Sequence, residues 1–405
     1  MRGCPLMNLS RICSRTGAMP AMRRVSSTTG VMIVTGCGRL ISGSLNLFEC
    51  ILMEQVLASV TTSRTAQKAG QKFQNCDHKE WAQYTISAHA VQCAMFNSTH
   101  TFVGLALART SPHRWVPYLT VTAIIAANLP DIEILTGLAG TPTYIQYHRG
   151  ITHTFIGIPV LSLALALAMY IFSGDFWRTF LVSLLVMATH PALDYANTYG
   201  LRPFLPFSGK WYYGDTLFII DPILDLILLA GIIASYRAKK NRLLFAWASI
   251  LVALAYIGAR VELRNEARAQ ISAFAATIPN FESSAVQPSM LNPWSWDGVI
   301  ETRNEFIKVR VHTRRGVEGE LARMPKGNPS EIIGHAVSAR SAAVFMGFAR
   351  FPVTRVEETE SGYRVMFIDF RFYNERARTA FAAEVLLDQS LDVVKDTLSF
   401  NKTVN

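Results

Sequence analysis

Charged residues are scarce in this chain of 405 residues, of which 17% are Asp, Glu, Lys or Arg and 50% are hydrophobic. An ordinary soluble domain carries about 25% charged residues, so the composition favours several membrane spans. The net charge of +10 is compatible with nucleic-acid binding. However, many of the basic residues flank apolar runs, where they are better interpreted as topology signals. We therefore expect no nucleic-acid partner.

Cysteine is absent after residue 93, although six cysteines precede that point. Their spacing matches no CxxC metal motif. The abrupt change indicates that residues 1–94 differ in origin from the rest, and we predict a poorly ordered extension. One interpretation is an upstream over-extension of the gene, with Met95 as the natural start. A regulatory or targeting extension is the alternative, although a clean secretory cleavage site is lacking.

Six apolar runs predict a helical membrane domain over residues 95–260. The third run contains no Asp, Glu, Lys or Arg and would be about 33 Å long as a helix, enough to cross a bilayer. The first two are short, so we expect them to be tilted, broken or partly buried. The runs are residues 103–108, 116–129, 151–172, 176–188, 217–236 and 243–257.

The remaining residues predict a smaller, separate part. Residues 261–296 are expected to form a helix followed by a linker rich in Pro and Trp. Residues 297–405 alternate apolar and polar residues as strands do and contain one helical stretch, so they predict a small α+β domain. The expected fold class is therefore mainly α, with about six apolar helices followed by an α+β extramembrane domain.

The orientation of the helices follows from the basic loop at residues 236–242, which contains four positive residues and no negative ones. The positive-inside rule places this loop in the cytoplasm. Counting back from this loop, every second loop between the apolar runs then lies on the extracytoplasmic side, and so does the α+β domain. A set of seven polar residues falls at these outward ends: His100, Asp131, His148, His153, His190, Asp194 and Asp215.

Histidine and aspartate in this set have the spacing of metal ligands. His148 and His153 lie at the mouth of an apolar run, where two imidazoles are costly unless something binds them. His190 and Asp194 lie at positions i and i+4, on one face of a helix. The alternatives are two solvated histidines in an interfacial loop, and a buried His–Asp pair that joins two helices.

The polar set as a whole predicts a metal site without cysteine ligands. Nitrogen and oxygen ligands suit zinc, or a two-metal site with manganese or magnesium. A structural zinc site is closed by about four ligands, and this set has more, so Asp131, Glu133 and Asp194 are candidate catalytic carboxylates. The predicted ligands are His100, Asp131, His148, His153, His190 and Asp194. The candidate supporting residues are Arg149, Asp215 and Asp221.

The motifs around these residues resemble the YdjM-like family of inner-membrane proteins. The resemblance covers residues 95–260 and lies in Pro130-Asp131, the segment His148-Arg-Gly-Ile-Thr-His153, and His190 with Asp194. It implies a membrane-embedded helical protein with metal-dependent hydrolase activity. Glu133 stands where the family has a second Asp, and Glu also ligates metals. A more distant similarity links the chain to zinc-dependent phospholipase C and related single-strand nucleases.

We therefore predict a multi-pass inner-membrane hydrolase with its site on the extracytoplasmic side. A metal-activated water would attack a phosphoester or lipid-linked substrate, so the expected partners are membrane lipids and a small-molecule or lipid substrate. One alternative is a transporter or metal-handling protein, which predicts polar residues near the bilayer midplane. Another is a scaffold whose C-terminal domain binds a partner.

Overall fold

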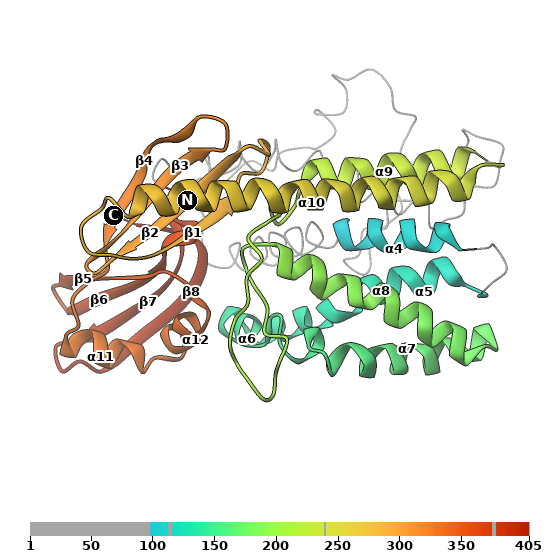
Figure 1. Cartoon of the computed structure of the whole chain (residues 1–405). Coiled ribbons are helices and arrows are strands. Elements are labelled where there is room, and N and C mark those ends of the chain that lie inside the picture. Colours follow the sequence, from blue (N-terminus) through green and yellow to red (C-terminus); the bar gives the residue numbers. More distant parts are fainter. Residues whose placement is uncertain (1–97, 112–115, 239, 375–377, 405) are drawn as a thin grey trace, which may run out of the picture. The chain divides into compact units, whose positions relative to one another are not determined.

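A computed structural model describes residues 98–404, except 112–115, 239 and 375–377. The predicted extension at residues 1–94 lies outside the described residues. Figure 1 shows a set of helices running alongside one another and, after them in the chain, a part built from sheets.

Six α-helices of ten or more residues make up most of the helical part. The helix pairs α4 with α5, α7 with α8, and α9 with α10 are neighbours in the chain and pack together, while α4 also packs on α9 and α10, and α8 on α5. Three further elements, the 3₁₀ helices η1 and η2 and the seven-residue helix α6, connect α5 to α7. In order, the elements are α4 (Ser98–Thr110), α5 (Leu119–Asn128), η1 (Leu129–Ala139), α6 (Thr141–Tyr147), η2 (Ile151–His153), α7 (Gly157–Ser173), α8 (Phe176–Ala196), α9 (Pro222–Arg237) and α10 (Arg242–Ala275).

Local sequence sets the helix ends and their close packing. Gly174 adopts a left-handed φ of 64° at the end of α7, and the Asp175 side chain then accepts a hydrogen bond from the Arg178 backbone N–H to begin α8. Between α9 and α10 the backbones approach closely at Gly231, where a Cβ atom would lie 2.0 Å from the Cβ of Ser249. Only glycine fits at that crossing.

The prediction of six membrane spans is wrong for the described part of the chain. Three helical stretches are long and apolar enough to cross a membrane: Leu119–Ala139, Phe176–Ala196 and Arg242–Ala275. The pair Thr141–His153 and Gly157–Ser173, bent by 78°, adds up to one more. The 13 residues of α4 and the 16 residues of α9 give lengths of only about 20 and 24 Å, short of the hydrocarbon thickness of about 30 Å.

The sheet part confirms the α+β expectation and begins earlier than predicted. Helix α10 continues without a break to Ala275, and β1 begins at Phe281, inside the range expected to be helix and linker. Both sheets are four-stranded and antiparallel, in the orders β1-β2-β3-β4 and β5-β6-β7-β8. The elements are β1 (Phe281–Pro288), β2 (Ser295–Thr302), β3 (Glu305–His312), β4 (Gly316–Pro325), α11 (Glu331–Val337), α12 (Arg340–Phe348), β5 (Pro352–Thr359), β6 (Gly362–Asp369), η3 (Phe370–Phe372), β7 (Thr379–Asp388) and β8 (Val393–Thr403).

Each sheet has an apolar core, and a buried lysine joins the two. The first sheet packs on the end of α10 through Trp296 and Ile271, and α12 places Phe345 against the second sheet. Lys308 on β3 donates from Nζ to the carbonyl oxygens of Arg371 and Tyr373, at 3.1 and 3.0 Å. Burial lowers the pKa of Lys308 to about 8.

Candidate metal site

Four side chains from three separate segments converge to form a metal-binding group. Asp131 comes from η1, His153 from η2, and His190 and Asp194 from successive turns of α8. One ligand atom from each lies within 4.8 Å of the other three. We call these four residues the ligand cluster.

The spacing within the ligand cluster suits one divalent ion. Asp131 Oδ1 lies 3.4 Å from His153 Nε2 and 3.3 Å from His190 Nε2. Asp194 Oδ2 lies 3.3 and 3.5 Å from the same two nitrogens. Ligands about 2.0–2.1 Å from a tetrahedral zinc ion would be about 3.4 Å apart. The other two separations, between the two histidine nitrogens and between the two carboxylate oxygens, are at most 4.8 Å. These distances are compatible with a closed coordination sphere and with one that keeps an open position.

Three of the four ligand atoms have no hydrogen-bond partner within the described residues, although they are buried. They are the Nε2 atoms of His153 and His190 and the Oδ2 atom of Asp194. Leaving a buried polar atom unpaired costs about 1–3 kcal/mol. Three such atoms pointing at one another are therefore what a cation site requires, and the residues present fit a divalent metal.

Hydrogen bonds behind the two histidines aim their Nε2 lone pairs into the cluster. His190 Nδ1 lies 2.7 Å from the carbonyl oxygen of Ala127, so this nitrogen carries the proton. Thr152 Oγ1 donates to Glu133 Oε2 at 2.6 Å and lies 2.9 Å from His153 Nδ1. Because the hydroxyl proton is already used on Glu133, His153 Nδ1 must be the donor to Thr152. Both Nε2 atoms are thus free to bind metal.

Arg149 holds the fourth ligand from behind. Its Nη2 donates to Asp194 Oδ1 at 2.7 Å, which leaves Oδ2 facing the cluster. Its Nη1 donates to Asn197 Oδ1 at 2.8 Å and to the Gly200 carbonyl at 3.1 Å. The buried guanidinium therefore fixes the carboxylate and the chain beyond α8 together, instead of facing the cluster as a phosphate binder would.

The turn that carries His153 has a tightly constrained backbone. Arg149 adopts a left-handed φ of 50°, which is uncommon for a residue with a side chain. A Cβ atom on Gly157 would lie 1.9 Å from the carbonyl oxygen of Ile151. The glycines at positions 150 and 157 therefore allow the close backbone packing of the turn that carries His153 into the cluster.

Glu133 and His148 lie beside the ligand cluster but outside it. The Glu133 carboxylate accepts hydrogen bonds from the backbone N–H groups of Arg149 and Gly150, besides the Thr152 hydroxyl. His148 Nδ1 lies 3.4 Å from Glu133 Oε1. In this structure Glu133 therefore orders the turn and supports His153 from its far side.

His100 also lies outside the four-residue group, on its other flank. Its ring stacks on His190 with centroids 3.7 Å apart, and its Nε2 lies 3.6 Å from Asp194 Oδ1. Its Nδ1 is buried without a hydrogen-bond partner among the described residues. His100 and Asp194 line one pocket together with Thr99, Asn197, Leu217 and Asp221, among others.

The two remaining predicted residues have partners of their own. Asp221 caps the N-terminus of α9 by accepting from the backbone N–H of Leu224, and it accepts the Tyr256 hydroxyl. Asp215 pairs with Arg350 at 2.8 Å. Burial raises the pKa of Asp215, and the positive charge of Arg350 opposes this shift. Asp215 thus joins the C-terminal part to the segment after α8 and does not contact the cluster.

The C-terminal part makes further contacts with that same segment. Arg371 donates from Nη1 to the Thr198 carbonyl at 2.9 Å and forms a buried pair with Asp369 at 2.6 Å. The Trp211 indole N–H donates to the Gly347 carbonyl at 2.8 Å. The segment after α8 is therefore held by Arg149 and also by these contacts with the C-terminal part.

Comparison with known proteins gives separate matches for the helical part and for the C-terminal part of the chain. The model of the YdjM inner membrane protein family matches residues 95–267, which include the whole ligand cluster. This region belongs to the YdjM family. The model of the YfhP C-terminal alpha/beta plait domain matches residues 331–403, which cover α11, α12 and strands β5 to β8.

One relative spans both regions. The uncharacterized protein YfhP of Bacillus subtilis (strain 168) is 24% identical over 314 residues, which cover 74% of this chain and 93% of YfhP. No solved structure matches the chain. Membership of the YdjM family and the candidate spans support a membrane location for the YdjM region.

Two supporting residues of the YdjM region escaped the sequence analysis. Thr152 and Asn197 mediate the contacts of His153 and Arg149. Thr152 could have been found, because a histidine ligand needs an acceptor for its second nitrogen and a hydroxyl precedes His153 directly. Asn197 follows Asp194 by three residues, but nothing in the sequence indicated that Arg149 would reach it.

Proposed function

We propose that this protein is a membrane-bound metal-dependent hydrolase. The single observation that carries the proposal is the set of buried, inward-facing and unpaired atoms of His153, His190 and Asp194 around the Asp131 carboxylate. Two imidazoles and two carboxylates fit zinc best, and manganese or magnesium are the alternatives. A bound ion would act as a Lewis acid and lower the pKa of water to about 7.

Asp131 is the residue best placed to take part in proton transfer. Its side chain is 18% exposed, whereas those of the other three cluster residues are at most 4% exposed. Substrate and water would reach the cluster from this more open side, and the second carboxylate oxygen of Asp131 could accept a proton there. Asp194 is held by Arg149 and would serve as a ligand only.

The proposed substrate is a phosphoester or a lipid-linked molecule at the outer face of the membrane. Sidedness is inferred from charge. The ends of α4 and α9 and the start of α10 meet, because Arg109 donates to Ser235 and Arg242 donates to the Arg109 carbonyl. This basic end of α4 is opposite to the end that carries His100. The positive-inside rule then places the cluster on the extracytoplasmic side.

The proposal is tested with detergent-purified protein on bis(p-nitrophenyl) phosphate and phosphatidic acid, with zinc, manganese or magnesium. We expect turnover that EDTA abolishes and added metal restores. Asp131→Asn should remove activity. Asp297→Asn is the matched control, because Asp297 pairs with Arg310 in the first sheet. Full activity of Asp131→Asn would contradict the proposal.

A metal-handling protein without hydrolytic activity is the competing function. It requires polar residues along a path through the helices. Asp225, one turn into α9, instead accepts hydrogen bonds from Ser98 and Thr99 at the start of α4, at the same end as the cluster. Stoichiometric metal without turnover of either substrate, combined with metal uptake into vesicles, would favour this alternative.

A further inference from the structure

The segment between α8 and α9 exposes aromatic side chains at the cluster end of the helices. Phe207 is 84% exposed and Phe204 is 43% exposed. Residues 201–212, which we call the aromatic loop, contain Arg202 and Lys210 and no acidic residue. A segment with exposed aromatic rings and basic residues but no acidic residue has the composition typical of a segment in the headgroup region of a bilayer.

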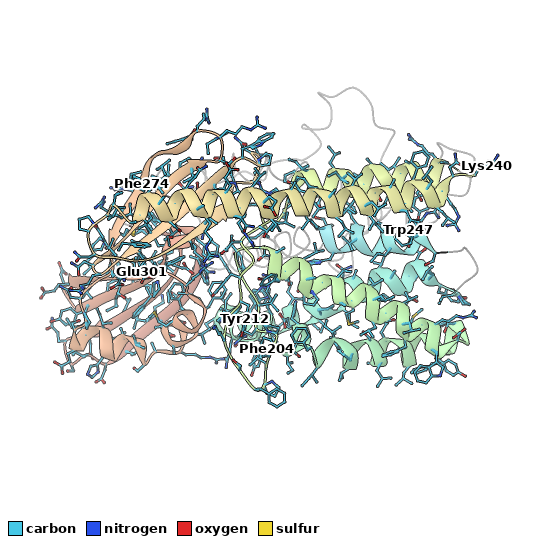
Figure 2. All side chains as sticks on the ribbon, viewed as in Figure 1. Phe204, Tyr212, Lys240, Trp247, Phe274 and Glu301 are labelled. Atoms are coloured by element: carbon cyan, nitrogen blue, oxygen red, sulfur yellow. The ribbon has the colours of Figure 1, made fainter. Side chains whose placement is uncertain are left out.

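The aromatic loop has a defined conformation, so its exposed rings are held outward. Leu201 and Tyr212 form a two-way backbone bridge, with N···O distances of 3.0 and 2.9 Å. Arg202 lies over the Trp211 ring, 4.6 Å from its centroid, and donates to the Gln146 carbonyl. Figure 2 shows Phe204 and Tyr212 on this loop, far along the helices from Lys240.

The exposed surface of the aromatic loop is continuous with the outer surface of α7. The Phe155 backbone N–H donates to the Pro203 carbonyl at 3.2 Å, and the rings of Phe155 and Phe204 have centroids 5.3 Å apart. Phe155 is itself 69% exposed. Exposed apolar residues then continue along α7, which belongs to a candidate span, and they include Val160, Leu163 and Leu167.

We propose that the aromatic loop inserts into the interfacial layer of the membrane beside the metal site. The lipid that covers the outer surface of α7 extends over Phe155 and Phe204 to Phe207. Lys210 then lies where the phosphates of the headgroups are. This contact is independent of whether the cluster catalyses hydrolysis, since it rests on the exposed surface and on the membrane location of α7.

The test measures the depth of position 207 in full-length protein reconstituted into vesicles of equal parts phosphatidylcholine and phosphatidylglycerol. All six cysteines lie before residue 94 and are changed to Ser, and Phe207→Cys is then labelled with a nitrobenzoxadiazole dye. Leu167→Cys on α7 is the lipid-facing control. Val394→Cys on β8, which is 68% exposed, is the water-facing control.

Lipids with a nitroxide near the top of the acyl chain should quench the dye at 207 severalfold more than at 394. Iodide in the buffer should quench it severalfold less than at 394. Equal quenching of positions 207 and 394 by both agents would overturn the proposal. Protection of position 207 from iodide and lipid alike would also overturn it, because a protein partner would then cover the loop.

Discussion

Replacement of Arg149 by Met is the perturbation whose consequences the structure defines best. The change removes the guanidinium that donates to Asp194 Oδ1, Asn197 Oδ1 and the Gly200 carbonyl, and of these Asn197 Oδ1 keeps the Tyr199 backbone N–H as a donor. Removing one partner of a buried ion pair costs about 3–5 kcal/mol. Loss of a residue that orients a metal ligand weakens metal binding by about 10- to 100-fold. We therefore expect Arg149→Met to lose both stability and metal affinity.

The assay combines thermal unfolding in detergent with zinc titration of the same preparations. Arg149→Lys should fall between wild type and Arg149→Met, because its ammonium keeps the positive charge but donates from one nitrogen, whereas the guanidinium donates from both Nη1 and Nη2. Arg310→Met is the matched control. Its partner Asp297 is partly exposed, and such surface pairs contribute about 0–1 kcal/mol. Wild-type stability and zinc affinity in Arg149→Met would refute the reasoning.

Three further predictions concern other contacts. Thr152→Val should weaken zinc binding by about 10- to 100-fold, because His153 Nδ1 loses its acceptor. Thr152→Ser, which keeps the hydroxyl, should bind zinc as wild type does. Equal zinc affinities of wild type and Thr152→Val in a titration would contradict this. Arg371→Met should destabilise the protein by about 3–5 kcal/mol in thermal unfolding, because the buried Asp369 carboxylate loses its cationic partner. An unchanged melting temperature would exclude this role. Between pH 8 and 10.5 folded Lys308 is mostly neutral while the unfolded residue is still protonated, so the unfolded state binds more protons and stability rises by about 3 kcal/mol across this window. Melting temperatures of wild type and Lys308→Met should show this rise in wild type alone, and parallel pH profiles would argue against it.

The sequence predicted the residues of the cluster better than their exact grouping. Asp131, His153, His190 and Asp194 were all among the predicted ligands, because charge bias and helix spacing place them at one end of the helices. His148 and Glu133, which were also predicted for the site, lie beside the cluster and contact each other. The left-handed backbone at Arg149, between His148 and His153, is a feature that a sequence pattern does not reveal.

The number of spans could not be predicted because apolar runs do not report helix length. The run at residues 217–236 predicts one span, yet α9 begins only at Pro222, where the Asp221 side chain caps its first turn. The fold class of the C-terminal part followed from alternation within its strands. The contacts of Arg350 and Arg371 with the segment after α8 are long-range, and no local pattern predicts them.

The metal content of detergent-purified protein tests the central claim most directly. After incubation with zinc and removal of the excess, mass spectrometry should find one or more tightly bound ions per chain in wild type. His190→Ala should lose the metal, and His335→Ala, which changes a histidine of α11 outside the ligand cluster, should keep it. Wild-type protein without metal, or His190→Ala with the full amount, would contradict the account.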